Sequence, residues 1–238
     1  MKFYYSQNLS HFTNILHAFT TKESGNLAFH VGDDPQVVEK NHELLSAALG
    51  YEKEKLVYMK QIHSDLVHVV TDEDFSRPPT CDALVTNKRG VPLMVMVADC
   101  SPVLLYDAKQ KVVAAVHAGR AGAFQNILKK TLALMTQEFG SRAEDVYATI
   151  GASIGVCCYE VGDEIDKEAK ALGLEYAMQK REERLYLDVN AILKKQLLEC
   201  GVGNIEMLEL CTCCNKEELF SYRAEMQTGR FAGIIMLR

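Results

Sequence analysis

Three side chains that can bind a metal ion or act in catalysis stand next to apolar runs of this sequence. Cys100 follows VPLMVMVAD, His117 follows KVVAAV, and His63 directly precedes SDLVHVV. Because scaffolds carry their sites where buried strands reach the surface, we expect these three side chains to meet. One thiolate and two imidazoles suit zinc, which takes three protein ligands and a water in catalytic sites. The alternative is that each histidine is a hydrogen-bonded structural residue.

A glycine loop follows His117 at once. Gly119-Arg120-Ala121-Gly122 stand before a helix expected from about residue 123. A helix N-terminus that glycine leaves open to close approach is an anion site, and Arg120 adds a fork of donors for phosphate or carboxylate. The simpler interpretation is a turn whose glycines serve backbone geometry alone.

The elements that must position these residues are short apolar strands among separated helices. Strands are expected at residues 64–70, 82–86, 91–98, 102–107, 111–118, 146–154 and 231–237, and helices at 35–49, 124–139, 163–172 and 188–200. The nearly continuous apolarity of the central strands predicts that both of their faces are covered. The pattern favours an α+β sandwich, as a single domain over residues 1–238.

Composition restricts the partners and the compartment. The 238 residues are 48% hydrophobic and carry a formal net charge of −6, with lysines and arginines scattered along the chain. Without a basic stripe, nucleic acid is not an expected partner. No segment resembles a signal peptide or a membrane span, so we expect a cytoplasmic protein without membrane contact, as a monomer or small homo-oligomer. The eight cysteines are expected to be thiols, ligands or nucleophiles.

Several ordered motifs resemble the YfiH family, also called the laccase-domain or multicopper polyphenol oxidoreductase family. The family pattern ADC-x-P-V-L-L followed by HAGWRG is similar to ADCSPVLLYD and VVAAVHAGRAG in this chain. Further similar stretches are GNLAFHVGDDP, KQIHS, DALVT, IGASIGVCCYEVG and FSYRAEMQTGRFAGIIML. The resemblance therefore extends over nearly the whole chain.

The resemblance implies a function and a set of site residues. Its metal ligands fall on His63, Cys100 and His117, the same three residues that the spacing favours. It implies a zinc-dependent purine nucleoside phosphorylase acting on adenosine, inosine, guanosine or methylthioadenosine with phosphate, with adenosine deaminase activity in addition. Substrate-binding roles are implied for Lys22, Gln61 and Arg120. The implied fold is a single α+β domain with mixed β-sheets in a sandwich flanked by helices, grouped with the catalytic domains of bacterial cytotoxic necrotising factors.

The sequence departs from the family pattern at three places. Arg120-Ala121 stand where relatives usually read Trp-Arg, and the chain has no tryptophan. Ala152 replaces a common proline, and Lys22 replaces a usual arginine. None of these departures lies at an implied metal ligand, so they bear on substrate binding rather than on metal binding.

Three other functions remain open. A copper-binding, laccase-like polyphenol oxidoreductase would use the same two histidines and cysteine, with an axial methionine from Met59, Met94 or Met96. The chain has too few other histidines, and no H-x-H pair, for a laccase's trinuclear cluster. Alternatively, Cys100 could be the nucleophile of a hydrolase or deamidase with His117 as its base, or the protein could edit cell-wall precursors. A non-catalytic zinc-binding module is the last of these alternatives.

The other chemically active residues are less easily assigned. Asp82, Asp99 and Glu160 are candidate proton shuttles for deamination. Cys211 and Cys214 have C-x-x-C spacing, but the adjacent pair Cys157-Cys158 is awkward for completing one tetrahedral site, so we expect buried structural thiols. For Arg223 and Arg230, which could close a pocket, we favour salt bridges around the last strand.

Overall fold

Two large β-sheets form the centre of the computed structural model, which describes residues 1–238. The five-stranded sheet has the order β1 (Phe3–Tyr4), β2 (Ile15–Thr20), β14 (Phe231–Leu237), β6 (Leu93–Val97), β3 (Val57–Tyr58). The six-stranded sheet has the order β13 (Asn204–Met207), β9 (Val146–Ile150), β7 (Ser101–Asp107), β8 (Val112–Ala118), β5 (Ala83–Thr86), β4 (Val67–Val69). Both sheets are mixed, because β3 is parallel to β6, β4 to β5, and β13 to β9.

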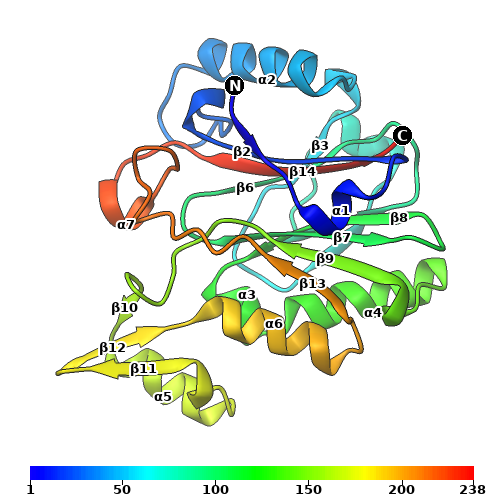
Figure 1. Cartoon of the computed structure of the whole chain (residues 1–238). Helices are drawn as coiled ribbons and strands as arrows, with labels where there is room; N and C mark the ends of the chain where they lie inside the picture. Colours follow the sequence, from blue (N-terminus) through cyan, green and yellow to red (C-terminus); the bar gives the residue numbers. More distant parts are fainter.

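Helices complete the layers. The α-helices are α1 (Gln7–Ser10), α2 (Pro35–Leu49), α3 (Arg120–Phe124), α4 (Ile127–Phe139), α5 (Asp163–Ala171), α6 (Val189–Glu199) and α7 (Tyr222–Glu225). Short 3-10 turns occur at Lys22–Ser24, Lys53–Lys55, Asp72–Phe75, Ala143–Asp145 and Glu175–Ala177. A small third sheet, β10 (Glu160–Val161), β12 (Arg184–Leu187) and β11 (Met178–Arg181), lies beside α5 at one end of the molecule (Figure 1). None of the helices combines the length and apolarity needed to cross a membrane.

The two large sheets pack face to face, and helices cover both outer faces (Figure 1). Helix α2 places Leu45 against the outer side of the five-stranded sheet. Helices α4 and α6 place Ile127 and Ile192 against the outer side of the six-stranded sheet. The expected α+β sandwich flanked by helices is thus confirmed.

The central strands are apolar along their whole length because both of their faces are buried. In β7, Leu104 and Tyr106 pack in the core between the sheets, whereas Val103 and Leu105 pack in the core under the helices. All seven residues of β7 and of β8 are buried. Successive side chains of a strand point to opposite faces, so each of these strands contributes to both cores. This agrees with the burial on both faces that their near-continuous apolarity predicts.

One predicted helix is wrong in its extent. The helix expected at residues 124–139 is two helices, α3 and α4, separated by Gln125 and Asn126. Asn126 has a left-handed backbone with φ 62°, a conformation that asparagine tolerates better than most residues. The break lets α3 begin at Arg120, directly after the glycine loop.

Candidate metal centre

Strand pairing brings Cys100 and His117 together at one edge of the two sheets. The chain leaves β6 at Val97 and enters β7 at Ser101, so Cys100 lies in the connection between the sheets. Strands β7 and β8 are antiparallel, with Ser101 opposite Ala118 and Pro102 opposite His117. His117 lies within β8, as the strand expected at residues 111–118 requires, but only 3% of its side chain is exposed. The expectation that it emerges at the surface is therefore wrong.

His63 arrives from a loop that is shaped by the Asp82 carboxylate. This carboxylate, fully buried at the start of β5, accepts the backbone N–H groups of His63 at 3.0 Å and Ser64 at 2.7 Å. It also accepts the Ser64 hydroxyl at 2.6 Å. His63 itself has φ 58°, a left-handed backbone that is uncommon for a residue with a side chain. The loop is thus held in a strained shape that turns the imidazole toward Cys100.

The three predicted ligands converge. Their donor atoms all lie within 4.8 Å of one another. The distance from His63 Nε2 to Cys100 Sγ is 3.8 Å, and the rings of His63 and His117 meet edge to face with centroids 4.8 Å apart. His63 is exposed, Cys100 is half-buried and His117 is buried. The group therefore forms the wall of a site that solvent reaches from the His63 side.

Asp82 also fixes the orientation of His117. Its Oδ1 atom lies 2.7 Å from His117 Nδ1, and its backbone oxygen accepts the His117 N–H at 2.7 Å. A carboxylate on Nδ1 keeps the proton on that nitrogen and leaves Nε2 free as a ligand atom. Metal-binding histidines in proteins usually have such a partner. The arrangement therefore fits a metal ligand.

The charges within the group favour a thiolate. Although burial raises the pKa of Cys100, the neighbouring His117 and His63 outweigh it and lower that pKa to about 6. Burial lowers the pKa of His117, but Cys100 and Asp82 outweigh it and raise that pKa to about 9. Although burial raises the pKa of Asp82, hydrogen bonds from His117 and Ser64 lower it to about 2. A thiolate is the form of cysteine that binds metals and attacks electrophiles.

Gly119 packs directly against two of the three candidate ligands, Cys100 and His63. A Cβ atom at this position would lie 2.8 Å from Cys100 Sγ and 3.3 Å from His63 Cδ2. Its backbone is extended at φ −78°, so close approach rather than an unusual conformation requires glycine here. The glycine loop therefore serves the cysteine and histidine group itself. Helix α3 has only five residues, so the long helix expected behind the anion loop is not there.

A cavity of about 470 Å³ opens over the group. The side chains that line it on the apolar side include Met96, Ile154, Tyr159 and Val189. Its basic lining consists of Arg120, Arg223 and Arg230 together with His30. A cavity of this size with convergent polar groups is typical of a small-molecule site, and its arginines suit an anionic group.

Two of the three predicted substrate-binding residues line this cavity. Gln61 lines it, although both ends of its amide are bonded to the backbone of Met96, at 2.7 and 2.9 Å. Arg120 lines it as well, and its guanidinium donates to Glu168 at 2.8 Å. Lys22 is not among the lining residues and pairs with Glu225 at 2.7 Å. The substrate roles of all three stay predictions.

The three candidate proton shuttles are already engaged. Asp82 binds His117 and the His63 loop. Asp99, whose backbone has φ 85°, accepts from the Thr212 and Ser221 hydroxyls at 2.6 and 2.7 Å and from the Arg223 N–H at 2.6 Å. Glu160 is exposed and pairs with Arg184 at 3.2 Å. Asp82 therefore positions two of the candidate ligands, Asp99 holds the segments of Thr212, Ser221 and Arg223, and neither offers a free carboxylate.

Sequence reasoning missed several residues of the cavity. His30, Tyr159 and Tyr222 line it but had no assigned role. The family-like stretches GNLAFHVGDDP, IGASIGVCCYEVG and FSYRAEMQTGRFAGIIML contain these residues, and a polar or aromatic residue in such a stretch is a site candidate. For Arg223 and Arg230, salt bridges were the favoured role. Instead, the guanidinium of each donates to backbone carbonyls, and both residues line the cavity.

The surroundings offer little for a blue-copper centre. Of the three candidate axial methionines, Met96 alone lines the cavity, whereas Met59 and Met94 lie in the hydrophobic cores. The other histidines are dispersed; for example, His17 bonds Ser6 and His42 bonds Leu27. No second histidine-containing group comes together as a metal site.

Comparison with known proteins gives the relatives of this chain. A protein of Corynebacterium glutamicum named purine nucleoside phosphorylase is 41% identical over 230 residues, which cover 92% of this chain and 93% of the relative. A protein of the same name from Bacteroides thetaiotaomicron is 32% identical over 255 residues, covering 97% and 94%.

Solved structures with the same fold extend over almost the whole chain. YlmD from Geobacillus stearothermophilus has a TM-score of 0.90 at 28% identity and covers 98% of this chain and 94% of its own. The hypothetical protein YfiH of Bacillus licheniformis has a TM-score of 0.89 at 29% identity, covering 94% and 93%. The family model described as multi-copper polyphenol oxidoreductase laccase matches residues 17–238. The chain therefore belongs to this laccase-like family, whose members include proteins named YfiH.

Proposed function

We propose that the protein is a zinc-dependent purine nucleoside phosphorylase. The observation that carries the proposal is the convergence of His63, Cys100 and His117 on the wall of a cavity that also contains three arginines. The relatives named purine nucleoside phosphorylase, one of which is 41% identical, support this class of reaction. Phosphorolysis needs an anion held beside the nucleoside, and this cavity has the charge to hold one.

The residues present fit zinc. Two imidazoles and one thiolate are a ligand set for a catalytic zinc, whose remaining position is open to substrate. The Asp82 carboxylate on His117 and the absent Cβ of Gly119 are the features expected around such a site. When bound, the metal supplies a Lewis acid at the end of the cavity.

The chain's own residues would bind and orient the substrates. Arg120 is suited to phosphate, because its exposed ion pair with Glu168 is of the weak kind that a dianion displaces. Tyr159 and Tyr222 offer aromatic surface for the purine base. Cleavage of the N-glycosidic bond then passes the ribosyl carbon to a phosphate oxygen, while the purine leaves with a proton. Throughout the reaction, the Asp82 carboxylate keeps the proton of His117 on Nδ1.

Deamination of adenosine is proposed as a side activity of the same site. Three protein ligands and an open cavity suit hydrolysis at the purine C6 position, with ammonia as the leaving group. We assign no general acid to this step, because Asp82, Asp99 and Glu160 each have other partners.

A cysteine hydrolase is the second candidate function, and one observation favours it. Cys100, His117 and Asp82 are arranged in space as a nucleophile, a base and a carboxylate that orients the base. His63 argues against it, because its Nε2 lies 3.8 Å from the same sulfur and a metal held there would occupy the lone pair of the nucleophile.

The two functions are separated by one experiment. Protein purified without added metal is analysed for zinc and incubated with adenosine, with and without inorganic phosphate. The phosphorylase predicts adenine and ribose 1-phosphate only when phosphate is present, and loss of both products in Cys100→Ala. Cys200→Ala, which changes a cysteine at the end of α6, is the control. Adenine release that is equal without phosphate, or unchanged in Cys100→Ala, would contradict the proposal.

A further inference from the structure

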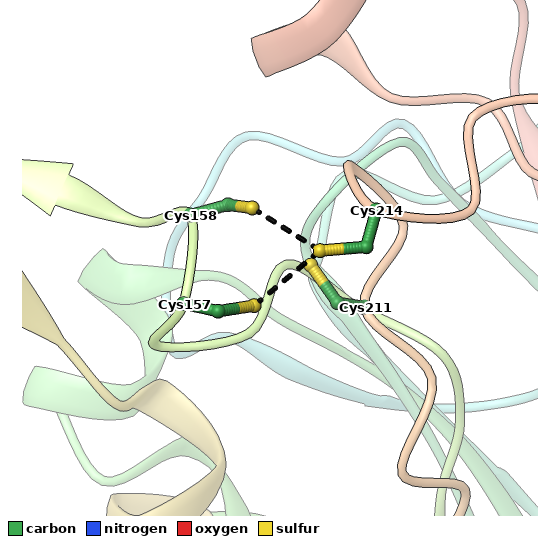
Figure 2. Close-up of side chains that lie close together, drawn as sticks. All are labelled: Cys157, Cys158, Cys211 and Cys214. Atoms are coloured by element: carbon green, nitrogen blue, oxygen red, sulfur yellow. Dashed lines mark hydrogen bonds between the residues drawn. The ribbon is translucent and has the colours of Figure 1, made fainter.

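Four cysteines outside the cavity group gather at a second place. Figure 2 shows Cys157 and Cys158 on one loop pointing toward Cys211 and Cys214 on another. Cys157 and Cys214 are exposed, and Cys158 and Cys211 are half-buried. The expectation of buried structural thiols is therefore wrong for these four residues.

The spacing of the four sulfur atoms suits a single tetrahedral ion. All four lie within 4.8 Å of one another, with Cys214 Sγ 3.4 Å from that of Cys158 and 3.6 Å from that of Cys157. Zinc–sulfur bonds of about 2.3 Å in a regular tetrahedron place neighbouring sulfurs about 3.8 Å apart. Thiol–thiol hydrogen bonds are weak, so they give little reason for four cysteines to converge.

Backbone contacts hold the two loops in register without help from the sulfurs. Ser153 pairs with Cys211 as an isolated bridge. The Ser153 N–H donates to the Leu210 oxygen at 3.2 Å, and the Thr212 N–H donates to the Ser153 oxygen at 3.0 Å. The adjacent pair Cys157-Cys158 lies on a turn in which both Cys158 and Tyr159 donate to the Gly155 oxygen at 3.0 Å. This turn presents two neighbouring residues toward the same point.

The surroundings suit negatively charged sulfur. The Gly155 N–H donates to Cys211 Sγ at 3.3 Å, a contact that stabilises a ligating thiolate. A Cβ at Gly155 would lie 3.2 Å from Cys157 Sγ and 3.3 Å from Cys211 Cβ. The guanidinium groups of Arg181 and Arg223 bind the Cys157 and Cys158 carbonyls at 3.5 and 3.0 Å. These two cations offset the charge that four thiolates around a divalent ion would carry.

We propose that Cys157, Cys158, Cys211 and Cys214 bind a second zinc ion in a closed structural site. Four sulfur ligands without an open position are typical of structural rather than catalytic zinc. Binding converts the thiols to thiolates, so up to four protons pass to solvent for each ion bound. No electron is transferred, and no oxidant is needed.

The position of the site gives it a role in shaping the cavity. The loop that carries Cys157 and Cys158 also carries Ile154 and Tyr159, which line the cavity. The Ile154 N–H donates to the Asp99 oxygen at 2.8 Å, next to Cys100. A metal ion between the two loops would fix this wall without touching substrate.

Zinc content of the full-length chain, purified without added metal, tests the proposal. We expect two zinc ions per chain in the unaltered protein and in Cys200→Ser, and one in the double variant Cys157→Ser/Cys214→Ser. Cys100→Ser is expected to retain one. The proposals for the two sites are therefore tested separately, because loss of the zinc ion in the cavity leaves the zinc ion of the four cysteines in place.

X-ray absorption at the zinc edge of Cys100→Ser provides a measurement that does not depend on the folding of the double variant. We expect four sulfur neighbours at about 2.3 Å around its remaining zinc. The proposal is overturned if Cys100→Ser holds no zinc, if its zinc has nitrogen or oxygen neighbours, or if the intact mass shows a disulfide among the four cysteines. An unchanged zinc content in the folded double variant would overturn it as well.

Discussion

Asp82 Oδ1 lies 2.7 Å from His117 Nδ1, and both side chains are buried at the edge where the two sheets meet. The same carboxylate shapes the loop that carries His63. One acid thus positions two of the three candidate ligands, and its loss is expected to affect the metal before it affects the fold.

Asp82→Asn is therefore predicted to lower zinc affinity by about 10- to 100-fold, because the amide cannot hold the proton on His117 Nδ1 in the same way. Competition with a chromogenic chelator measures the affinity. Asp74→Asn is the matched control, since Asp74 is also a buried acid that binds a histidine, His68, at 2.7 Å. Equal zinc affinity in the two variants would argue against the role of Asp82.

Gly119→Ala tests the close approach over the ligands. Its Cβ would lie 2.8 Å from Cys100 Sγ, so the cysteine or the loop has to move. We expect zinc affinity and turnover to fall by about 10-fold or more, as for other changes that misplace ligands. Gly203→Ala, where a Cβ meets nothing within 4 Å, is the control. If Gly119→Ala behaves like Gly203→Ala in metal binding, the packing argument fails.

Substitutions of Arg120 and of Glu168 are predicted to change the KM for phosphate in opposite directions. Removing the guanidinium in Arg120→Ala should raise the KM for phosphate by about 10-fold, the value of one charge-assisted hydrogen bond, with a smaller effect on the nucleoside KM. Glu168→Gln should lower the KM for phosphate, because it frees Arg120 from its 2.8 Å partner. Initial rates over a grid of both substrates measure these values. An equal rise in both KM values for Arg120→Ala would contradict a phosphate role.

His42 predicts a pH dependence of stability that is independent of the metal centre. Burial lowers the pKa of this imidazole from 6.5, and its Nε2 lies 2.8 Å from the Leu27 oxygen beside the Phe29 ring. The unfolded chain therefore binds a proton at a higher pH than the folded chain does. The stability that His42 contributes is fully present above pH 6.5 and falls as the pH drops from there toward the lowered pKa.

Urea unfolding between pH 7.5 and 5 measures this effect. His42→Gln keeps an N–H donor for the Leu27 carbonyl but cannot titrate, so its free energy of unfolding should fall less across this range. Parallel curves for the two proteins would show that His42 does not contribute.

The sequence was sufficient for the sandwich and for the three converging residues. Strands such as β7 and β8 are recognisable because burial on both faces makes them continuously apolar. Cys100 and His117 adjoin these strands, so their meeting follows from the pairing of neighbours in the chain. His63 directly precedes the strand expected at residues 64–70, and the family-like motif KQIHS indicates the same residue.

Features that depend on tertiary contacts were not predictable in this way. Phe124 and Ile127 continue the apolar spacing of one helix, although the helical backbone is broken between them at Asn126. The apolar repeat therefore does not reveal the break between α3 and α4. The four-cysteine group depends on the Ser153–Cys211 bridge between loops that lie far apart in sequence. Lys22 illustrates the opposite case, since a motif position suggested a substrate role but the side chain pairs with Glu225 outside the cavity lining.

The most direct test of the metal centre is a crystal of the active protein measured on both sides of the zinc absorption edge. We expect an anomalous peak at a zinc ion bonded to Cys100 Sγ at about 2.3 Å and to one nitrogen each of His63 and His117 at about 2.0 to 2.1 Å. Crystals of protein that releases adenine with phosphate, yet show no anomalous scatterer among these three side chains, would contradict it.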